Sequence, residues 1–186
     1  LWSKSFKSSD INAADPVLYN GKIFLSSSNF NPGCELIELS GTSTSSKWKN
    51  RNMRIYFNAG VVIGDYLYGG STPHSAVRCI NMETGETEWT KNSIPCASIT
   101  AADAKLIILS RTGDLYIAEA SPSRFMQLAK AKVITGTCLT VPVLANRSLY
   151  VRNSRGTLYK LQMSEMVIET QPLAVNFAGS DLEFSW

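Results

Sequence analysis

A unit of about 40 residues recurs four times in this chain of 186 residues, and this period constrains the fold more than any other feature. Each unit opens with an apolar lead, a two-residue turn and an apolar-rich segment, at residues 16–28, 60–71, 99–111 and 142–154. The turns are Asn20-Gly21, Gly64-Asp65, Asp103-Ala104 and Asn146-Arg147, and such residues suit the positive φ of a hairpin turn. The residue after the turn falls at 22, 66, 105 and 148, so the spacings are 44, 39 and 43. The repeats therefore predict four consecutive hairpins.

A second pair of strand-like segments completes each unit, and these include residues 33–39, 76–82, 113–120 and 156–163. Alternation with a period of two indicates strands, whereas a helical repeat of similar length would show a period of 3.6. Four short strands in about 40 residues are typical of a β-propeller blade. The sequence therefore predicts an all-β fold, a β-propeller of four-stranded antiparallel blades, with about four blades in an incomplete or open ring.

The repeat places residues 1–186 in a single propeller region. The predicted blades span residues 14–50, 58–92, 97–131 and 140–172. Residues 1–6 are expected to end a preceding blade, because Leu1-Trp2 stands where a blade would finish. Such an arc would leave unpaired strands at its ends, so we expect self-association through these edges or a second copy that completes the ring.

The best preserved unit contains the sequence CINMETGETEW, residues 79–89. It resembles the blade signature of the quinoprotein-like, or PQQ-like, propeller family, and the match covers Asn81, Thr84, Gly85 and Trp89. The resemblance implies a tight turn at Thr84-Gly85 and a Trp that docks onto the neighbouring blade. Three tryptophans at spacings of 46 and 41 are predicted to share this structural role: Trp2, Trp48 and Trp89.

The resemblance covers nearly all of residues 1–165. This stretch is similar to the C-terminal half of bacterial secreted or periplasmic PQQ-like repeat proteins, which are relatives of a lipoprotein that scaffolds barrel assembly in the outer membrane. The resemblance implies a periplasmic or secreted location. It also implies a non-enzymatic binding or scaffold module of the cell envelope, with a protein partner or a small ligand. Propellers host many unrelated activities, so the resemblance is more specific for fold than for function.

Few residues suit enzymatic or metal chemistry. A quinoprotein dehydrogenase would need a calcium site of carboxylate and amide oxygens and adjacent cysteines, and the chain has no Cys-Cys pair. The four cysteines form no CxxC pair, and the single histidine, His74, lies in a Gly/Ser/Pro loop, which argues against zinc. We therefore expect free thiols with at most one disulfide, no bound cofactor or metal, and no dehydrogenation.

One set of polar residues is a candidate lining of the central channel. The innermost strand of a blade starts near this channel, and the repeat register brings together Asn12, Asp15, Asn58, Ser98 and Thr140. Small polar residues crowd where several strands converge, and they would then bind only channel water. The alternative is a site for a small ligand or an ion.

Charge and hydropathy limit the other partners. The net charge of +3 is spread along the chain, and its densest basic stretch is Lys47, Lys49, Arg51 and Arg54. We interpret this stretch as a solvated loop and expect no nucleic-acid partner. No apolar run approaches the roughly 18 residues of a membrane helix, so no membrane-spanning segment is expected.

Two other functions stay open at this point. One is a diverged quinoprotein-type oxidoreductase whose cofactor site lies on blades outside this chain. The other is a cell-surface or carbohydrate recognition module, because Tyr56, Phe57, Tyr66 and Tyr68 lie near predicted blade edges.

Overall fold

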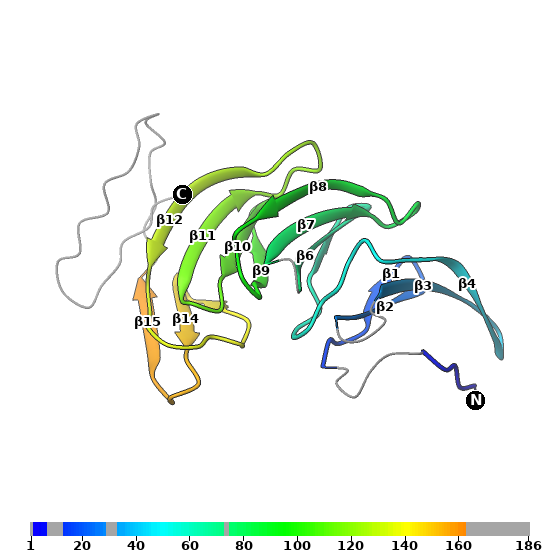
Figure 1. The fold of residues 1–186 in the computed structure, drawn as a ribbon, viewed down its shortest axis with the longest axis horizontal. Coiled ribbons are helices and arrows are strands. Elements are labelled where there is room, and N and C mark those ends of the chain that lie inside the picture. Colours follow the sequence, from blue (N-terminus) through cyan, green and yellow to red (C-terminus); the bar gives the residue numbers. More distant parts are fainter. Residues whose placement is uncertain (1, 7–12, 29–32, 73–74, 163–186) are drawn as a thin grey trace.

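A computed structural model describes residues 2–6, 13–28, 33–72 and 75–162. These residues form fifteen strands and no helix. The strands build four separate antiparallel sheets that follow one another along an open arc (Figure 1). The structure therefore confirms the predicted all-β architecture and an incomplete β-propeller.

The strands of each sheet are ordered as they occur in the chain, from the inside of the arc outwards. The first sheet contains β1 (Val17–Tyr19), β2 (Lys22–Ser27), β3 (Gly33–Ser40) and β4 (Ser43–Asn50). The second contains β5 (Val61–Ile63), β6 (Tyr66–Ser71), β7 (Ala76–Asn81) and β8 (Thr87–Asn92). We call these sheets blade I and blade II.

The third sheet, blade III, contains β9 (Ser98–Ala102), β10 (Lys105–Leu109), β11 (Asp114–Glu119) and β12 (Met126–Lys132). Blade IV contains β13 (Val143–Ala145), β14 (Ser148–Arg152) and β15 (Leu158–Gln162), so within the described residues it has three strands. The predicted remainder of this blade, up to residue 172, lies outside the described residues.

Three of the four hairpin turns have a positive φ at both central residues, and the turn of blade II has it at Gly64 alone. Positive φ occurs at both central residues of the first turn, Asn20 (45°) and Gly21 (72°). The same holds for Asp103-Ala104 in blade III and for Asn146-Arg147 in blade IV. This mirror-image turn matches the twist of the flanking strands, and it fixes the register of the inner hairpin.

The core consists of three apolar clusters, one between each pair of neighbouring blades. Central strands contribute to two clusters at once. Leu106 and Ile108 of β10 pack towards blade II, whereas Ile107 and Leu109 pack towards blade IV. The central strands, such as β10 and β11, are therefore buried on both faces.

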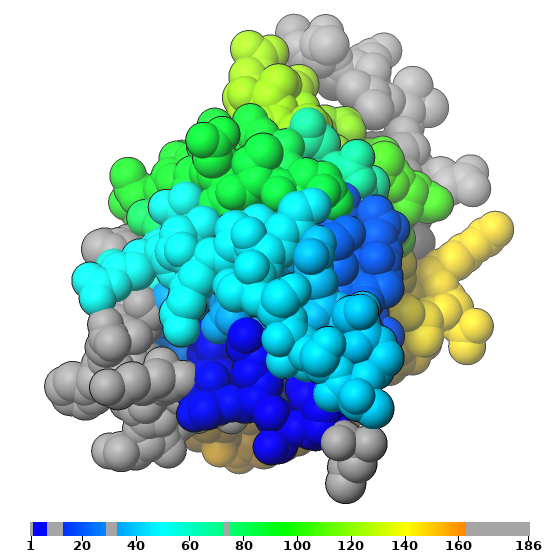
Figure 2. Space-filling model, turned by 90° about the vertical axis from the view of Figure 1, so that its right-hand side faces the viewer, coloured from blue at the N-terminus to red at the C-terminus, as the bar shows by residue number. Residues whose placement is uncertain are grey.

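The N-terminal segment, residues 2–6, lies against blade I (Figure 2). Lys4 forms an ion pair with Glu35 of β3, at 2.8 Å between Nζ and Oε1. Lys49 of β4 places its ammonium group 5.6 Å from the ring centre of Phe6. The segment forms no strand, and its origin in a preceding blade stays a prediction.

Candidate functional site

Two tryptophans join consecutive blades. Trp48 of β4 donates a hydrogen bond from Nε1 to the carbonyl oxygen of Met82 in blade II, at 2.8 Å. Trp89 of β8 makes the corresponding bond to the carbonyl oxygen of Ser121 in blade III, also at 2.8 Å. Each indole thus extends from the outer strand of one blade to the end of the third strand of the next.

Trp89 is buried in the cluster between blades II and III, with 9% of its surface exposed. Its ring centre lies 6.0 Å from that of Tyr68 and 5.5 Å from that of Phe125, the latter in an edge-to-face arrangement. Trp2, the third predicted docking residue, is 39% exposed and lies in the N-terminal segment. The structure therefore places two of the three tryptophans between blades.

Asn81 stabilises the turn at Thr84-Gly85, and the ring of Trp48 packs against this turn. The Oδ1 atom of Asn81 accepts hydrogen bonds from the backbone N–H groups of Glu83 (2.9 Å) and Thr84 (3.2 Å). Gly85 has a φ of 76°, and a Cβ atom there would lie 2.7 Å from the ring of Trp48. Only a glycine suits this position, because the backbone is left-handed and the indole covers it.

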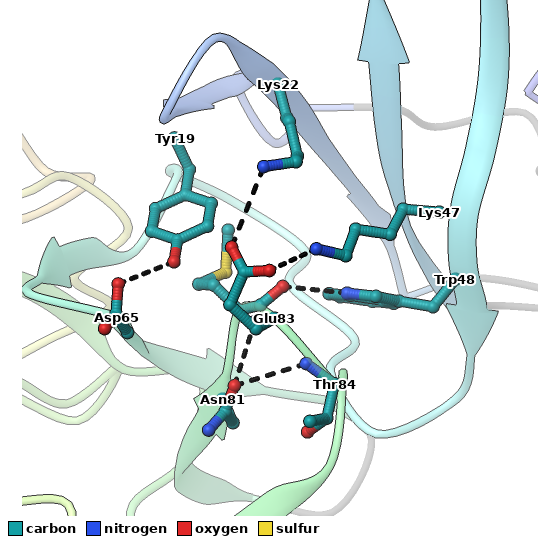
Figure 3. A network of polar contacts seen from close by, with 9 residues as sticks. Tyr19, Lys22, Lys47, Trp48, Asp65, Asn81, Glu83 and Thr84 are labelled. Carbon is teal, nitrogen blue, oxygen red and sulfur yellow. Dashed lines mark hydrogen bonds and ion pairs between the residues drawn. The ribbon is translucent and has the colours of Figure 1, made fainter.

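A network of charged and polar groups surrounds this turn at the contact of blades I and II (Figure 3). Glu83 forms ion pairs with Lys47 of β4 and with Lys22 of β2, the second at 3.7 Å. The bond from Lys47 is the main cause of a lowered pKa of Glu83. Tyr19 donates from its hydroxyl group to Oδ1 of Asp65 at 2.7 Å. Burial and this bond raise the pKa of Tyr19, so its hydroxyl group stays protonated at neutral pH and can act as the donor.

The candidate channel residues are brought together only in part. Asn58 donates from Nδ2 to Oγ of Ser98 at 2.6 Å and lies 3.5 Å from the carbonyl oxygen of Leu139. Ser98 is buried, whereas Asp15 and Thr140 are exposed. Asn12 lies outside the described residues. The contacts of Asn58 link the starts of blades II and III with the segment that leads to blade IV.

Glu35 is a buried carboxylate that the sequence reasoning missed. It is 2% exposed and pairs with Lys4 at 2.8 Å and with Lys49 at 3.5 Å. Burial by itself would raise the pKa of Glu35, but the bond and charge of Lys4 and the charge of Lys49 outweigh it and lower this pKa. The sequence around Glu35 does not indicate this ion pair, because Lys4 is distant in sequence and Glu35 lies in an otherwise ordinary strand.

All four cysteines are free. Burial raises the pKa of both Cys34 and Cys79 to about 12, so these thiols stay protonated at neutral pH. Among the described residues, no group of three or more His, Cys, Asp or Glu side chains is placed to hold a metal ion. His74 lies outside the described residues. The described part of the chain also contains no helix with the length and apolar character of a membrane span.

Aromatic residues proposed for ligand recognition are mostly used inside the fold. Tyr68 is 1% exposed in the cluster between blades II and III, and Tyr66 packs against the same cluster. Tyr56 and Phe57 are half-buried and pack on each other edge to face, with ring centres 4.2 Å apart.

Comparisons with known proteins support the propeller fold. No protein-family profile and no curated protein sequence matches the chain. The structure is similar to BamB from Moraxella catarrhalis, with a TM-score of 0.61 and 15% identity over 78% of this chain. The chain spans 41% of that BamB chain. The computationally designed Ika4 protein matches with a TM-score of 0.67 and 10% identity, over 86% of this chain and 95% of the designed one.

The N-terminal domain of Nup159 is a more distant neighbour, with a TM-score of 0.53 and 14% identity. It matches over 81% of this chain and 41% of its own. At such low identities, these similarities establish the fold alone. The chain is thus a β-propeller module, and its function has to be argued from its own residues.

Proposed function

We propose that this chain is part of a non-enzymatic β-propeller that serves as a binding or scaffold module of the cell envelope. The observation that carries the proposal is the direction of the pKa shifts. A general acid or base works best with a pKa near the operating pH. Catalytic sites therefore raise the pKa of carboxylates and lower the pKa of nucleophilic thiols. Among the described residues, every resolved shift of a carboxylate lowers its pKa and every resolved shift of a thiol raises its pKa, which is the opposite direction.

The shifted carboxylates stabilise the structure and do not hold protons at neutral pH. Lysines lower the pKa of Glu35 and of Glu83. For Asp114, burial acts to raise the pKa, but bonds from Thr112 and Ser110 and the charge of Lys132 lower it overall. The pKa values of the Cys34 and Cys79 thiols are raised. These groups are therefore suited to join blades and strands.

The envelope location rests on two similarities of different kinds. The CINMETGETEW unit resembles blades of secreted or periplasmic PQQ-like repeat proteins. The fold is similar to that of BamB, although the 15% identity carries no function by itself. Cell fractionation tests this part of the proposal, and we expect the protein in the envelope fraction. Recovery in the cytoplasmic fraction would contradict it.

We place the protein partner on the free face of blade IV. Val143 and Leu158 are exposed by 56% and 65%, and Val143 faces Tyr150 in the register of β13 and β14. Within the described residues, β15 is hydrogen-bonded to a strand on one side only. Exposed apolar side chains on one face of a blade favour association with another protein surface.

Calorimetric titration with PQQ and calcium separates this proposal from the oxidoreductase alternative. We expect no saturable heat. Binding at micromolar or tighter affinity, equivalent to roughly 8 kcal/mol or more, would favour the redox function. An absorbance spectrum of the mixture would then show whether the cofactor is held in a defined environment.

A further inference from the structure

We propose that blades I and II bind a compact oxyanion of the phosphate or sulfate class between Arg54 and Arg78. Arg54 lies in the segment that connects β4 to β5, and Arg78 lies on β7. This site is separate from the network in Figure 3, which surrounds the β7–β8 turn. The inference goes beyond the proposed scaffold function and does not depend on it.

The strand register directs Arg78 towards blade I. Arg78, Ile80 and Met82 are every second residue of this stretch and therefore lie on the same side. Ile80 and Met82 belong to the apolar cluster between blades I and II. Its partner across the strand pair is Gly69 of β6, which has no side chain. Met53 and Ile55, the neighbours of Arg54 in sequence, pack at this glycine. The charge of Arg54 acts on Arg78, so both arginines belong to the same contact between blades.

Blade I holds the backbone around Arg54 in place. Ser26 of β2 donates from Oγ to the carbonyl oxygen of Met53 and accepts from the backbone N–H of Ile55 at 3.0 Å. From blade II, the backbone N–H of Thr72 donates to the carbonyl oxygen of Arg54 at 2.9 Å. The arginine backbone is thus fixed by both blades, as a preorganised site requires.

Within the part of the chain that the structure describes, three buried donors at this contact have no hydrogen-bond partner. They are Nε of Arg54, Nε of Arg78 and Oγ of Ser71, and Ser71 is 0% exposed. Ser71 follows Gly69 on the same face of β6, so its hydroxyl group is on the side of Arg78. Buried donors without partners are rare in folded proteins, and a bound ion is one of the standard reasons for them.

The electrostatics of the contact favour an anion. Burial lowers the pKa of Arg78, and the positive charge of Arg54 lowers it further. The positive charges of Arg54 and Arg78 both act on Cys34. Its thiol is nevertheless protonated at neutral pH and provides no negative charge. The nearby carboxylates of blades I and II, Glu35 and Glu83, are paired with lysines. Among the described residues, no carboxylate is paired with Arg54 or Arg78, and a bound anion would compensate the two neighbouring charges.

The donor set fits an oxyanion with several acceptor oxygens. A guanidinium group presents its N–H donors in a planar fork that matches phosphate, and such charge-assisted bonds are short and strong. One of the N–H groups of Arg78 is already used, because Nη1 donates to the carbonyl oxygen of Asn52 at 2.7 Å. This bond orients the guanidinium group. The remaining donors of two guanidinium groups and one hydroxyl group suit a tetrahedral anion.

Nuclear magnetic resonance of the arginine side chains tests the site in the wild-type protein. Sodium phosphate would be titrated at constant ionic strength while the Nε–Hε signals are followed, with sodium chloride as the reference salt. We expect the signals of Arg54 and Arg78 to shift in a saturable way with one common Kd. Shifts that do not saturate, or that chloride reproduces, would overturn the proposal.

Matched variants give a second readout. Arg78→Gln should weaken phosphate binding at least tenfold and abolish the phosphate-dependent rise in Tm, which we expect to be about 3–5 °C at ten times the Kd. Arg124→Gln removes the same charge from an exposed position of blade III and should change the Kd less than twofold. An equal loss in both variants would reveal nonspecific charge screening and would overturn the site.

The source of the anion is decided by comparing inorganic phosphate with phosphoserine. Equal affinity for phosphoserine would assign the site to phosphoryl groups carried by larger molecules. Binding of inorganic phosphate alone would assign it to the free ion. Binding of neither would overturn the proposal.

Discussion

Replacement of Trp89 by alanine is the most informative test of how the blades are joined. The indole is 9% exposed and contacts Tyr68 of its own blade and Phe125 of blade III. It also donates to the carbonyl oxygen of Ser121 at 2.8 Å. Trp89→Ala therefore removes a large buried ring, two aromatic contacts and one hydrogen bond at a single contact between blades.

Removal of a buried tryptophan costs about 3–5 kcal/mol, because transferred area is lost and a cavity remains. We expect Trp89→Ala to lie in this range. For a chain of this size, such a loss corresponds to a decrease in Tm of about 6–20 °C. Trp89→Phe keeps most of the ring but loses the bond to Ser121, so it should cost only about 1–2 kcal/mol.

Urea denaturation followed by far-ultraviolet circular dichroism measures these differences. Trp2→Ala is the matched control, because Trp2 is 39% exposed and its loss should change the free energy of unfolding by less than about 0.5 kcal/mol. A cost below 1 kcal/mol for Trp89→Ala would refute the reasoning. Equal costs at Trp2 and Trp89 would also refute it, because burial between blades would then not matter.

Three further predictions concern other contacts of the same fold. Gly85→Ala should destabilise by more than 2 kcal/mol in urea denaturation, because its Cβ would lie 2.6–2.7 Å from side-chain atoms of blade I; at Gly21, which has nothing within 4 Å, only the smaller backbone cost applies. Glu35→Gln should lower the free energy of unfolding by about 1–2 kcal/mol at pH 7. This difference should vanish as the pH falls through the lowered pKa of Glu35, which lies below the ordinary value of about 4.3. A difference that persists at pH 2 would contradict the ion-pair account. Cys34 should react with a thiol reagent only on unfolding, whereas half-buried Cys96 should react earlier; rapid modification of Cys34 in the folded protein would show that its burial is wrong.

The fold was predictable because its signals are local. Turn residues such as Asn20, Gly21 and Asn146 have the left-handed conformations that their types favour. Period-two alternation then indicates most strands. Residues 124–132 have a pattern that resembles a helical turn, and the repeat register predicts an outer strand there. The structure places Met126–Lys132 of this stretch in β12, the outer strand of blade III.

Contacts between blades were harder to predict, since they depend on how sheets and connecting segments meet. Glu83 lies in an exposed turn, and nothing in the repeat pattern indicates that two lysines of blade I pair with it. Arg54 and Arg78 lie 24 positions apart in unrelated patterns, and only the packing of β7 against the β4–β5 segment brings them together. Of the residues predicted to line the channel, Asn58 and Ser98 form a hydrogen bond with each other.

The central claim, that this propeller is a scaffold with a protein partner in the cell envelope, is tested most directly by photo-crosslinking in cells of the source organism. A photoreactive amino acid would replace Leu158 on the free face of blade IV, with Glu86 in an exposed turn of blade II as the control position. We predict one defined protein adduct from position 158 in the envelope fraction, and none from position 86. The absence of any adduct at position 158, or equal adducts from positions 158 and 86, would contradict the account.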